Sequence, residues 1–181
     1  MQTPKTYLLT ALVAALIGLA LAAVANDGRA QADSADEPRE IEWVPLDTGL
    51  VLAKADDKHV FINFTTSWCG FCKKMDKTTF ADAEVIKMMR DNFVTVKVDG
   101  DGRDTLSLDG YKITERNLTR AEFGVGSFPT YWFLSPAGEK LGMIKGYQFK
   151  KQLMPYLTYV AERQYDTTEA GQDDSEKAEK E

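Results

Sequence analysis

Cysteine and histidine are scarce in this chain of 181 residues, which holds two cysteines and a single histidine. A structural zinc site needs four ligands, usually cysteine or histidine, and this chain has too few of both. Covalent haem attachment requires a histidine directly after the second cysteine of a Cys-X-X-Cys pair, but Lys73 stands there. We therefore expect no metal site and no cofactor.

Basic residues are also too few to suggest a nucleic-acid partner. Lysine and arginine number 22 against 28 aspartates and glutamates, which gives a formal net charge of −6. The acidic excess lies at the carboxyl end, where residues 166–181 hold seven acids against two lysines. The remainder is nearly neutral and has no basic stripe that would follow a phosphate backbone, so no nucleic-acid binding is expected.

The amino terminus carries the clearest signal for cellular location. Lys5 precedes a largely apolar run from Tyr7 to Ala25, and the small residues at 23–25 and 30–32 are typical of signal-peptide cleavage sites. Counted through Ala25, the run also reaches the length needed to span a bilayer. Residues 1–25 thus predict a signal peptide, or an inner-membrane anchor that tethers the protein through residues 7–25. Both predict export to the periplasm or an equivalent space.

The rest of the chain divides into three parts by composition. Residues 26–40 are rich in Ala, Asp, Glu and Gly and predict a flexible spacer. Residues 41–165 carry the hydrophobic patterns of one folded domain. Residues 166–181 lack aromatic and branched apolar side chains and predict a disordered acidic tail.

Hydrophobic periodicity predicts an α/β order for the folded domain. The expected strands are residues 59–64, 93–98, 130–134 and 140–144, and the expected helices are residues 47–57, 69–75, a segment capped by Asp82, 115–123 and 149–163. The right-handed crossover rule makes the first two strands parallel, and the closing hairpin adds an antiparallel edge. The prediction is a central mixed sheet flanked by helices.

Three details of this prediction are specific enough to test. Asp47-Thr48 is expected to cap the first helix, with Leu50, Val51 and Ala53 facing inward. The valines at 94, 96 and 98 are expected to share one face of their strand. The stretch from Asp99 to Thr114 is expected to be turn-rich and polar.

The pair Cys69 and Cys72 lies between a buried strand and a helix. A thiol in the first helical turn meets unsatisfied N–H groups and the positive end of the helix dipole, both of which favour the thiolate. Lys73 adds positive charge nearby. Cysteines of Cys-X-X-Cys pairs in such surroundings are nucleophiles. We therefore expect Cys69 to attack and Cys72, one turn deeper, to resolve the mixed disulfide.

Other interpretations of the cysteine pair remain open. A structural staple is less favoured, because a loop of about four residues gains only about 2 kcal/mol in the chain-entropy estimate. A Cu(I) carrier needs only two thiolates. A non-catalytic binding module could use the same fold as a scaffold, and turnover of a disulfide substrate would distinguish an enzyme from both.

Several motifs together resemble the thioredoxin-like superfamily. The run from Val60 to Phe64 leading into Trp68-Cys69-Gly70-Phe71-Cys72-Lys73 is similar to that family's active-site strand and helix start. Phe128-Pro129-Thr130 resembles the family's cis-proline loop. Lys74-Met75 and the residues 79–82 are similar to an exported branch that includes thiol:disulfide interchange proteins and periplasmic reductases.

The resemblance implies roles for particular residues. Trp68, Gly70 and Phe71 would shape the substrate-binding rim. A cis bond at Pro129 would turn the Phe128 backbone toward Cys69, where a substrate strand could pair with it.

Two departures from the family pattern bear on this reading. The family's buried aspartate is here Asn63, whose amide takes up no proton at neutral pH. Lys97 matches the lysine beside that aspartate and could supply charge, but its partner is missing. The connection from Asp99 to Thr114 is about ten residues longer than in thioredoxin, and is either a specificity loop or a surface insertion.

The sequence thus predicts an exported thiol:disulfide oxidoreductase. It would exchange a dithiol for a disulfide with protein substrates, acting as a reductase. Because exported spaces are oxidising, the reduced form would need electrons from a partner such as a membrane thiol reductase.

Overall fold

The structure is a computed structural model that describes residues 40–108 and 110–166. The predicted leader at residues 1–25, and all of the predicted spacer and tail except Glu40 and Asp166, lie outside the described residues. These predictions therefore stay predictions. Within the described ranges, no helix has the length and apolar character needed to cross a membrane.

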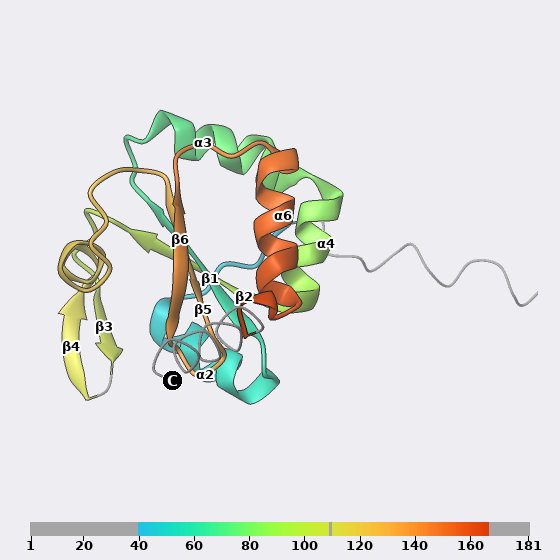
Figure 1. Cartoon of the computed structure of the whole chain (residues 1–181). Helices are drawn as coiled ribbons and strands as arrows, with labels where there is room; N and C mark the ends of the chain where they lie inside the picture. Colours follow the sequence, from blue (N-terminus) through green and yellow to red (C-terminus); the bar gives the residue numbers. More distant parts are fainter. Residues whose placement is uncertain (1–39, 109, 167–181) are drawn as a thin grey trace, which may run out of the picture. The chain divides into compact units, whose positions relative to one another are not determined.

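A four-stranded mixed sheet forms the centre of the domain (Figure 1). Its strands are β1 (His59–Thr65), β2 (Phe93–Asp99), β5 (Thr130–Leu134) and β6 (Lys140–Lys145), in the order β2-β1-β5-β6. β1 runs parallel to β2, whereas β5 is antiparallel to both β1 and β6. The central strand β1 is buried on both faces, as its continuous apolar run predicts. The expected mixed sheet is confirmed.

Three helices cover one face of the sheet. They are α3 (Gly70–Lys77), α4 (Ala83–Asn92) and α6 (Lys150–Ala161), and the 3-10 turn η1 (Thr79–Ala81) joins the first two. The Asp82 side chain accepts hydrogen bonds from the first amides of α4 and so caps that helix, as predicted. The buried core beneath these helices is rich in aromatic and long apolar side chains: Phe61, Met75, Phe80, Val85, Met89, Phe93, Tyr131, Phe133, Leu153, Leu157 and Val160.

The opposite face packs against α2 (Leu46–Asp56) and the segment that follows β2. That segment consists of β3 (Thr105–Leu108), β4 (Tyr111–Thr114), the short helix α5 (Glu115–Asn117) and the π-helical turn η2 (Leu118–Glu122). Figure 1 shows the β3–β4 hairpin on the side of the sheet away from α4 and α6. The buried core on this face combines residues of the sheet with residues of α2, β3, η2 and the segment after η2: Leu46, Ala53, Val60, Ile62, Phe64, Val96, Val98, Leu106, Leu118, Phe123, Val125 and Leu134. Val94 packs against the same cluster, so the three valines share a face as expected.

The expectation for α2 is wrong in two details. The helix begins one residue earlier and follows Pro45, with no side-chain cap from Asp47 or Thr48. Val51 is 70% exposed, whereas Leu46 and Ala53 are buried. Together with Gly49 these buried residues are three and four positions apart and form one stripe of the helix, and Val51 lies outside it.

The expectation of a turn-rich, polar stretch from residue 99 to 114 is also wrong in part. Residues 105–108 and 111–114 pair as an antiparallel hairpin outside the main sheet. Gly110 has a φ of 85°, a conformation that favours glycine and suits a tight turn. Leu106 anchors the hairpin in the core with only 7% of its surface exposed. A two-stranded ribbon needs such tertiary packing to be stable, which is why the sequence pattern alone did not reveal it.

Candidate active site

The two cysteines form a disulfide at the start of α3. The Cα atoms of Cys69 and Cys72 lie 5.3 Å apart and the sulfurs are bonded at 2.04 Å. The helix begins at Gly70, one residue later than expected, so Cys69 is its N-cap rather than part of its first turn. Its backbone N–H donates to the Thr66 carbonyl at 3.1 Å, which fixes the turn that leads from β1 into the helix.

A hydrogen bond distinguishes the two sulfurs. The Cys72 backbone N–H donates to Cys69 Sγ at 3.1 Å, as a capping side chain would accept it. No hydrogen bond to Cys72 Sγ is found within the described ranges. An amide donor and the positive end of a helix both favour an anion at the Cys69 position. The geometry therefore supports the assignment of Cys69 as the nucleophile.

Exposure does not distinguish the two cysteines as expected. Cys69 is 5% exposed and Cys72 is 3% exposed, so neither sulfur is an open tip with the other sheltered beneath it. The residues around them are open instead: Trp68 is 66% exposed, Phe71 is 62% exposed, and Gly70 lies at the surface. The disulfide is thus buried next to exposed aromatic side chains, and neither cysteine belongs to the two apolar core clusters.

Aromatic side chains from several segments pair near the disulfide. The Trp68 ring meets the Phe128 ring edge-to-face, with centroids 5.8 Å apart. On the other side of the disulfide, the Phe71 ring lies 6.4 Å from that of Tyr147, over which Lys74 places its ammonium at 4.6 Å. The Phe128–Pro129 peptide bond is cis, as the resemblance implies. Trp68 with Phe128, and Phe71 with Tyr147, thus form two aromatic pairs, and these four side chains are called the aromatic rim below. Its role in binding substrate stays a prediction.

Asn63 and Lys97 lie behind the disulfide, paired across β1 and β2. Asn63 is 2% exposed and its Oδ1 has no hydrogen-bond partner among the described residues. Its neighbour on β5, Tyr131, is fully buried and its hydroxyl also lacks a partner there. Burial is the main cause that raises the pKa of Tyr131, and the charge of Asp76 raises it further. Neither buried group carries a charge that could replace an aspartate.

Lys97 does have a partner, which corrects the expectation from the sequence. Its Nζ lies 3.1 Å from Asp76 Oδ1, a carboxylate supplied by α3 instead of β1. The same ammonium lies 5.2 Å from the centre of the Trp43 ring. Asp76 follows Cys72 by four residues, the spacing that places two side chains on one helix face. That spacing is the sequence signal that could have found it.

A cleft of about 570 Å³ opens beside these groups. Its charged lining consists of Lys73, Asp76, Lys97, Asp99 and Glu115. The Lys73 N–H donates to the Cys69 carbonyl at 3.2 Å, whereas its side chain makes no hydrogen bond or ion pair within the described part of the chain. The pKa of the Glu115 carboxyl is raised, mainly by burial and also by the charge of Asp99. The hydrogen bond that the Asp99 N–H donates to this carboxyl acts in the opposite direction. The cleft therefore gathers ionisable groups next to the active-site helix.

Sequence reasoning missed Asp101 entirely. Its Oδ2 accepts a hydrogen bond from Trp68 Nε1 at 2.8 Å, although the two residues are 33 positions apart. Its Oδ1 lies 3.3 Å from the guanidinium nitrogens of both Arg116 and Arg120. The Trp68 hydrogen bond is the largest cause that lowers the pKa of the Asp101 carboxyl, and the two arginines lower it further. An acid in a polar connection gives no sequence signal for such a contact.

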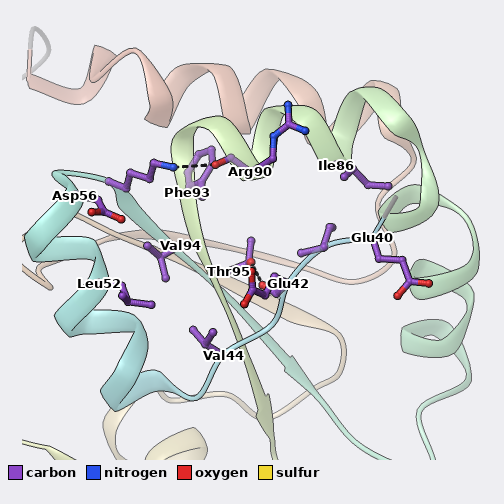
Figure 2. A pocket seen from close by; sticks show the side chains of 12 residues that line it. Glu40, Glu42, Val44, Leu52, Asp56, Ile86, Arg90, Phe93, Val94 and Thr95 are labelled. Carbon is purple, nitrogen blue, oxygen red and sulfur yellow. Dashed lines mark hydrogen bonds between the residues drawn. The ribbon is translucent and has the colours of Figure 1, made fainter. Parts of the chain in front are cut away.

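A second hollow of about 280 Å³ lies at the outer edge of β2, between α2 and α4 (Figure 2). Figure 2 shows Leu52, Phe93 and Val94 among the side chains that line it. At its edge, Lys58 Nζ donates to the Arg90 carbonyl at 2.9 Å. Its lining includes neither cysteine and no residue of the aromatic rim. In residues 40–108 and 110–166, no group of three or more His, Cys, Asp or Glu side chains is arranged to hold a metal ion.

The arrangement is suited to thiol–disulfide exchange. Comparison with known proteins agrees: residues 46–161 match the family model described as a thioredoxin-like domain. The thiol:disulfide interchange protein DsbD of Campylobacter jejuni is 30% identical over 105 residues, which cover 56% of this chain but only 17% of that protein. The chain thus matches less than a quarter of the length of this relative.

Two shorter relatives match over most of their length. Thioredoxin of Alicyclobacillus acidocaldarius is 28% identical over 116 residues, which cover 63% of this chain and 92% of that protein. The solution structure of a thioredoxin from Thermus thermophilus superposes with a TM-score of 0.55 at 27% identity, covering 67% of this chain and 87% of that one.

Proposed function

This chain belongs to the thioredoxin-like domain family, and from that membership we propose that it is a thiol:disulfide oxidoreductase that reduces disulfides of exported proteins. The observation that carries the proposal is the position of Cys69 Sγ at the N-cap of α3, where it accepts the Cys72 N–H, next to exposed aromatic side chains. The relatives named as interchange protein and thioredoxin support the class of reaction.

The reduced protein carries out two exchange steps. The Cys69 thiolate attacks one sulfur of a substrate disulfide, forming a mixed disulfide and expelling the other substrate sulfur as a thiolate. Cys72 then loses its proton and attacks Cys69 Sγ, which releases the second substrate sulfur. Two electrons pass to the substrate, whose two thiols take up the Cys72 proton and one proton from the solvent, and the Cys69–Cys72 disulfide forms.

The surroundings of the pair assist both steps. The Lys73 ammonium has no partner among the described residues and follows Cys72 by one residue, and its charge favours thiolates. The Phe128–Pro129 peptide bond is cis, as in the family that the sequence resembles, and an extended substrate segment would add to the Phe128 backbone by main-chain hydrogen bonds. The aromatic rim receives apolar side chains of the substrate next to its cysteine.

The location and the electron donor belong to the same proposal. The apolar run at residues 7–25 supports export, with or without a retained anchor. In an oxidising space the disulfide form would accumulate, so turnover requires a dithiol donor on the membrane. A thiol:disulfide interchange protein is the kind of partner that could supply it.

The test uses the two single variants, Cys69→Ser and Cys72→Ser, with an alkylating thiol probe near pH 6. Cys69 in the Cys72→Ser variant should react much faster than Cys72 in the Cys69→Ser variant. The Cys72→Ser variant should also trap a mixed disulfide with a protein substrate. Equal, ordinary thiol reactivity of the two would contradict the assignment. A reduction potential near about −270 mV supports the reductase direction, and one near about −120 mV contradicts it. Stoichiometric Cu(I) binding without exchange activity would identify a metal carrier instead.

A further inference from the structure

The outer side of α3 carries three exposed lysines. Lys73 and Lys74 precede Lys77 by four and three residues, so the three side chains share one side of the helix. None of these ammoniums makes a hydrogen bond or an ion pair among the described residues. The acid of the same helix, Asp76, is paired with Lys97 of β2 instead. The helix dipole favours lysines in the last turn but supplies no carboxylate, so the three charges remain available to an external anion.

This side of the helix is uncovered and begins at the disulfide. It is called the lysine face below and consists of five exposed residues: Gly70, Phe71, Lys73, Lys74 and Lys77. A Cβ built on Gly70 would meet no atom within 4 Å, and Figure 1 shows α3 along the upper border of the described domain. Cys69 is the N-cap of the same helix. A polypeptide whose disulfide reaches Cys69 Sγ therefore brings its neighbouring residues onto the lysine face.

A row of three aromatic rings borders the lysines. The Phe71 ring lies 6.4 Å from that of Tyr147, and the Tyr147 ring meets the Phe149 ring edge-to-face at 5.0 Å between centroids. Lys74 Nζ lies 4.6 Å from the centre of the Tyr147 ring, so the cations and the rings are continuous. Phe149 is 53% exposed although it is large and apolar. Apolar side chains that gather at the surface beside charged groups mark an interaction site.

Three hydrogen bonds fix the central ring of this row and the segment after it against α3 and η1. The Tyr147 hydroxyl shares a hydrogen bond of 2.9 Å with Thr78 Oγ1. Thr79 Oγ1 donates to the Gln148 carbonyl at 2.7 Å, and the Gln148 N–H donates to Met75 Sδ at 3.4 Å. A surface that is ordered before it binds a partner loses less conformational entropy on binding. The aromatic row is therefore a preformed border of the lysine face.

We propose that the lysine face and its aromatic row form a docking surface for acidic polypeptide segments that flank the cysteine of a substrate disulfide. The ammoniums attract the carboxylates of the segment, and the row binds an apolar side chain beside them. Charges across an interface select and steer partners more than they add affinity, so this surface decides which disulfides are reduced. The inference rests on the proposed function for the reaction, but not for the binding.

The test compares two peptides that have the same disulfide and the same aromatic residue, flanked by glutamates in one and by lysines in the other. At low salt, kcat/KM should be about tenfold higher for the acidic peptide, through KM, and the preference should disappear at about 0.5 M salt, where the charges are screened. Lys74→Glu and Lys77→Glu should each lower the preference about threefold. Lys54→Glu makes the same charge change at an exposed position of α2, beyond the opposite face of the sheet, and should leave the preference unchanged.

The ratio of the two peptides cancels any effect on the chemistry of Cys69, because both present the same disulfide. A wild-type ratio near one, or an equal change in Lys74→Glu and Lys54→Glu, would overturn the proposal. The occupant is tested in a full-length variant whose six acids in residues 167–181 are replaced by their amides. Wild-type rates in this variant support the proposal, whereas faster reduction of the acidic peptide would assign the surface to the chain's own acidic segment and contradict it.

The aromatic row has its own pair of variants. Phe149→Ser should lower kcat/KM about fivefold for both peptides, because the row loses an apolar ring. Tyr159→Ser removes a ring of similar exposure from α6 and should leave both rates unchanged. Equal effects of the two substitutions would exclude the row from the docking surface.

Binding is measured separately from turnover by NMR. With the cysteines of the acidic peptide replaced by serine, the backbone amide resonances of Gly70, Lys74 and Lys77 should shift at low salt. The basic peptide should not shift them, and unshifted resonances with the acidic peptide would refute the docking surface. If the wild-type protein reduces neither peptide, the proposed function fails, and these shifts alone decide whether the lysine face binds acidic segments.

Discussion

Reduction of the Cys69–Cys72 disulfide should lower the stability of the folded domain slightly. Closing a loop of about four residues restricts the unfolded chain by about 2 kcal/mol, which favours the oxidised protein. In the reduced protein, the helix N-terminus stabilises an anion at Cys69 by roughly 0.3–1 kcal/mol. Because Cys69 is only 5% exposed, desolvation offsets part of that gain. The loop term therefore wins, and the oxidised form should be more stable by about 1 kcal/mol.

This difference sets the direction of exchange through a thermodynamic cycle. If the folded state prefers the disulfide by about 1.4 kcal/mol, its reduction potential lies about 30 mV below that of the same cysteines in the unfolded chain. A protein with a potential shifted in that direction gives up electrons more readily than an unfolded dithiol, as a reductase must. The stability measurement thus tests the proposed direction without any substrate.

The assay is urea denaturation at neutral pH, with and without a reductant that leaves other groups unchanged. The oxidised form should show the higher midpoint and, in a thermal scan, a melting temperature higher by about 4 °C. The double variant Cys69→Ser/Cys72→Ser serves as the control and should not respond to the reductant. A reduced form more stable by about 1 kcal/mol or more would refute the reasoning, because thiolate stabilisation would then dominate and the protein would act as an oxidant.

Two further predictions concern Gly70, at the start of α3, and His59, at the start of β1. No atom lies within 4 Å of a Cβ built on Gly70, and the φ of Gly70 is not positive. Gly70→Ala should therefore raise the free energy of unfolding, measured by urea denaturation, by about 0.5–1 kcal/mol. A loss of stability would show that the open space is needed by the fold. Burial is the largest cause that lowers the pKa of His59, and the charge of Arg163 lowers it further. The His59 ring is hydrogen-bonded to the Tyr165 hydroxyl at 2.7 Å. Because the pKa is lower in the folded protein, the unfolded chain binds the proton first as the pH falls below about 6.5. Stability should therefore decrease on acidification below that pH, by at most about 1.4 kcal/mol per pH unit, and the slope should flatten in His59→Gln; an unchanged slope in that variant would assign the effect to other groups.

Much of the fold was predictable because its signals are local. The continuous apolar run of β1, the Asp82 cap and the spacing of Leu153, Leu157 and Val160 each act within a few residues. The hairpin at 105–114 was missed because its strands are four residues long and only Leu106 is deeply buried. Short strands become stable through packing that no local pattern displays.

The sequence by itself determined the reactive pair and its setting. Two cysteines three residues apart, between a strand buried on both faces and a helix, leave little freedom for their placement, since the strand end and the helix start are adjacent in the chain. The cis bond at Pro129 followed from resemblance, and the pairing of Thr130 with Phe64 places Pro129 next to the end of β1 that leads to the cysteines.

Only the tertiary structure decided what surrounds the pair. Lys97 meets Asp76 across 21 residues, and Trp68 meets Asp101 across 33. Charged and polar side chains of this kind have no periodic pattern, and their partners are fixed by how strands, helices and the hairpin pack together. The reactive pair could therefore be recognised from residues adjacent in the sequence. The groups that contact the rim and pair with its charges are brought together only by the tertiary structure.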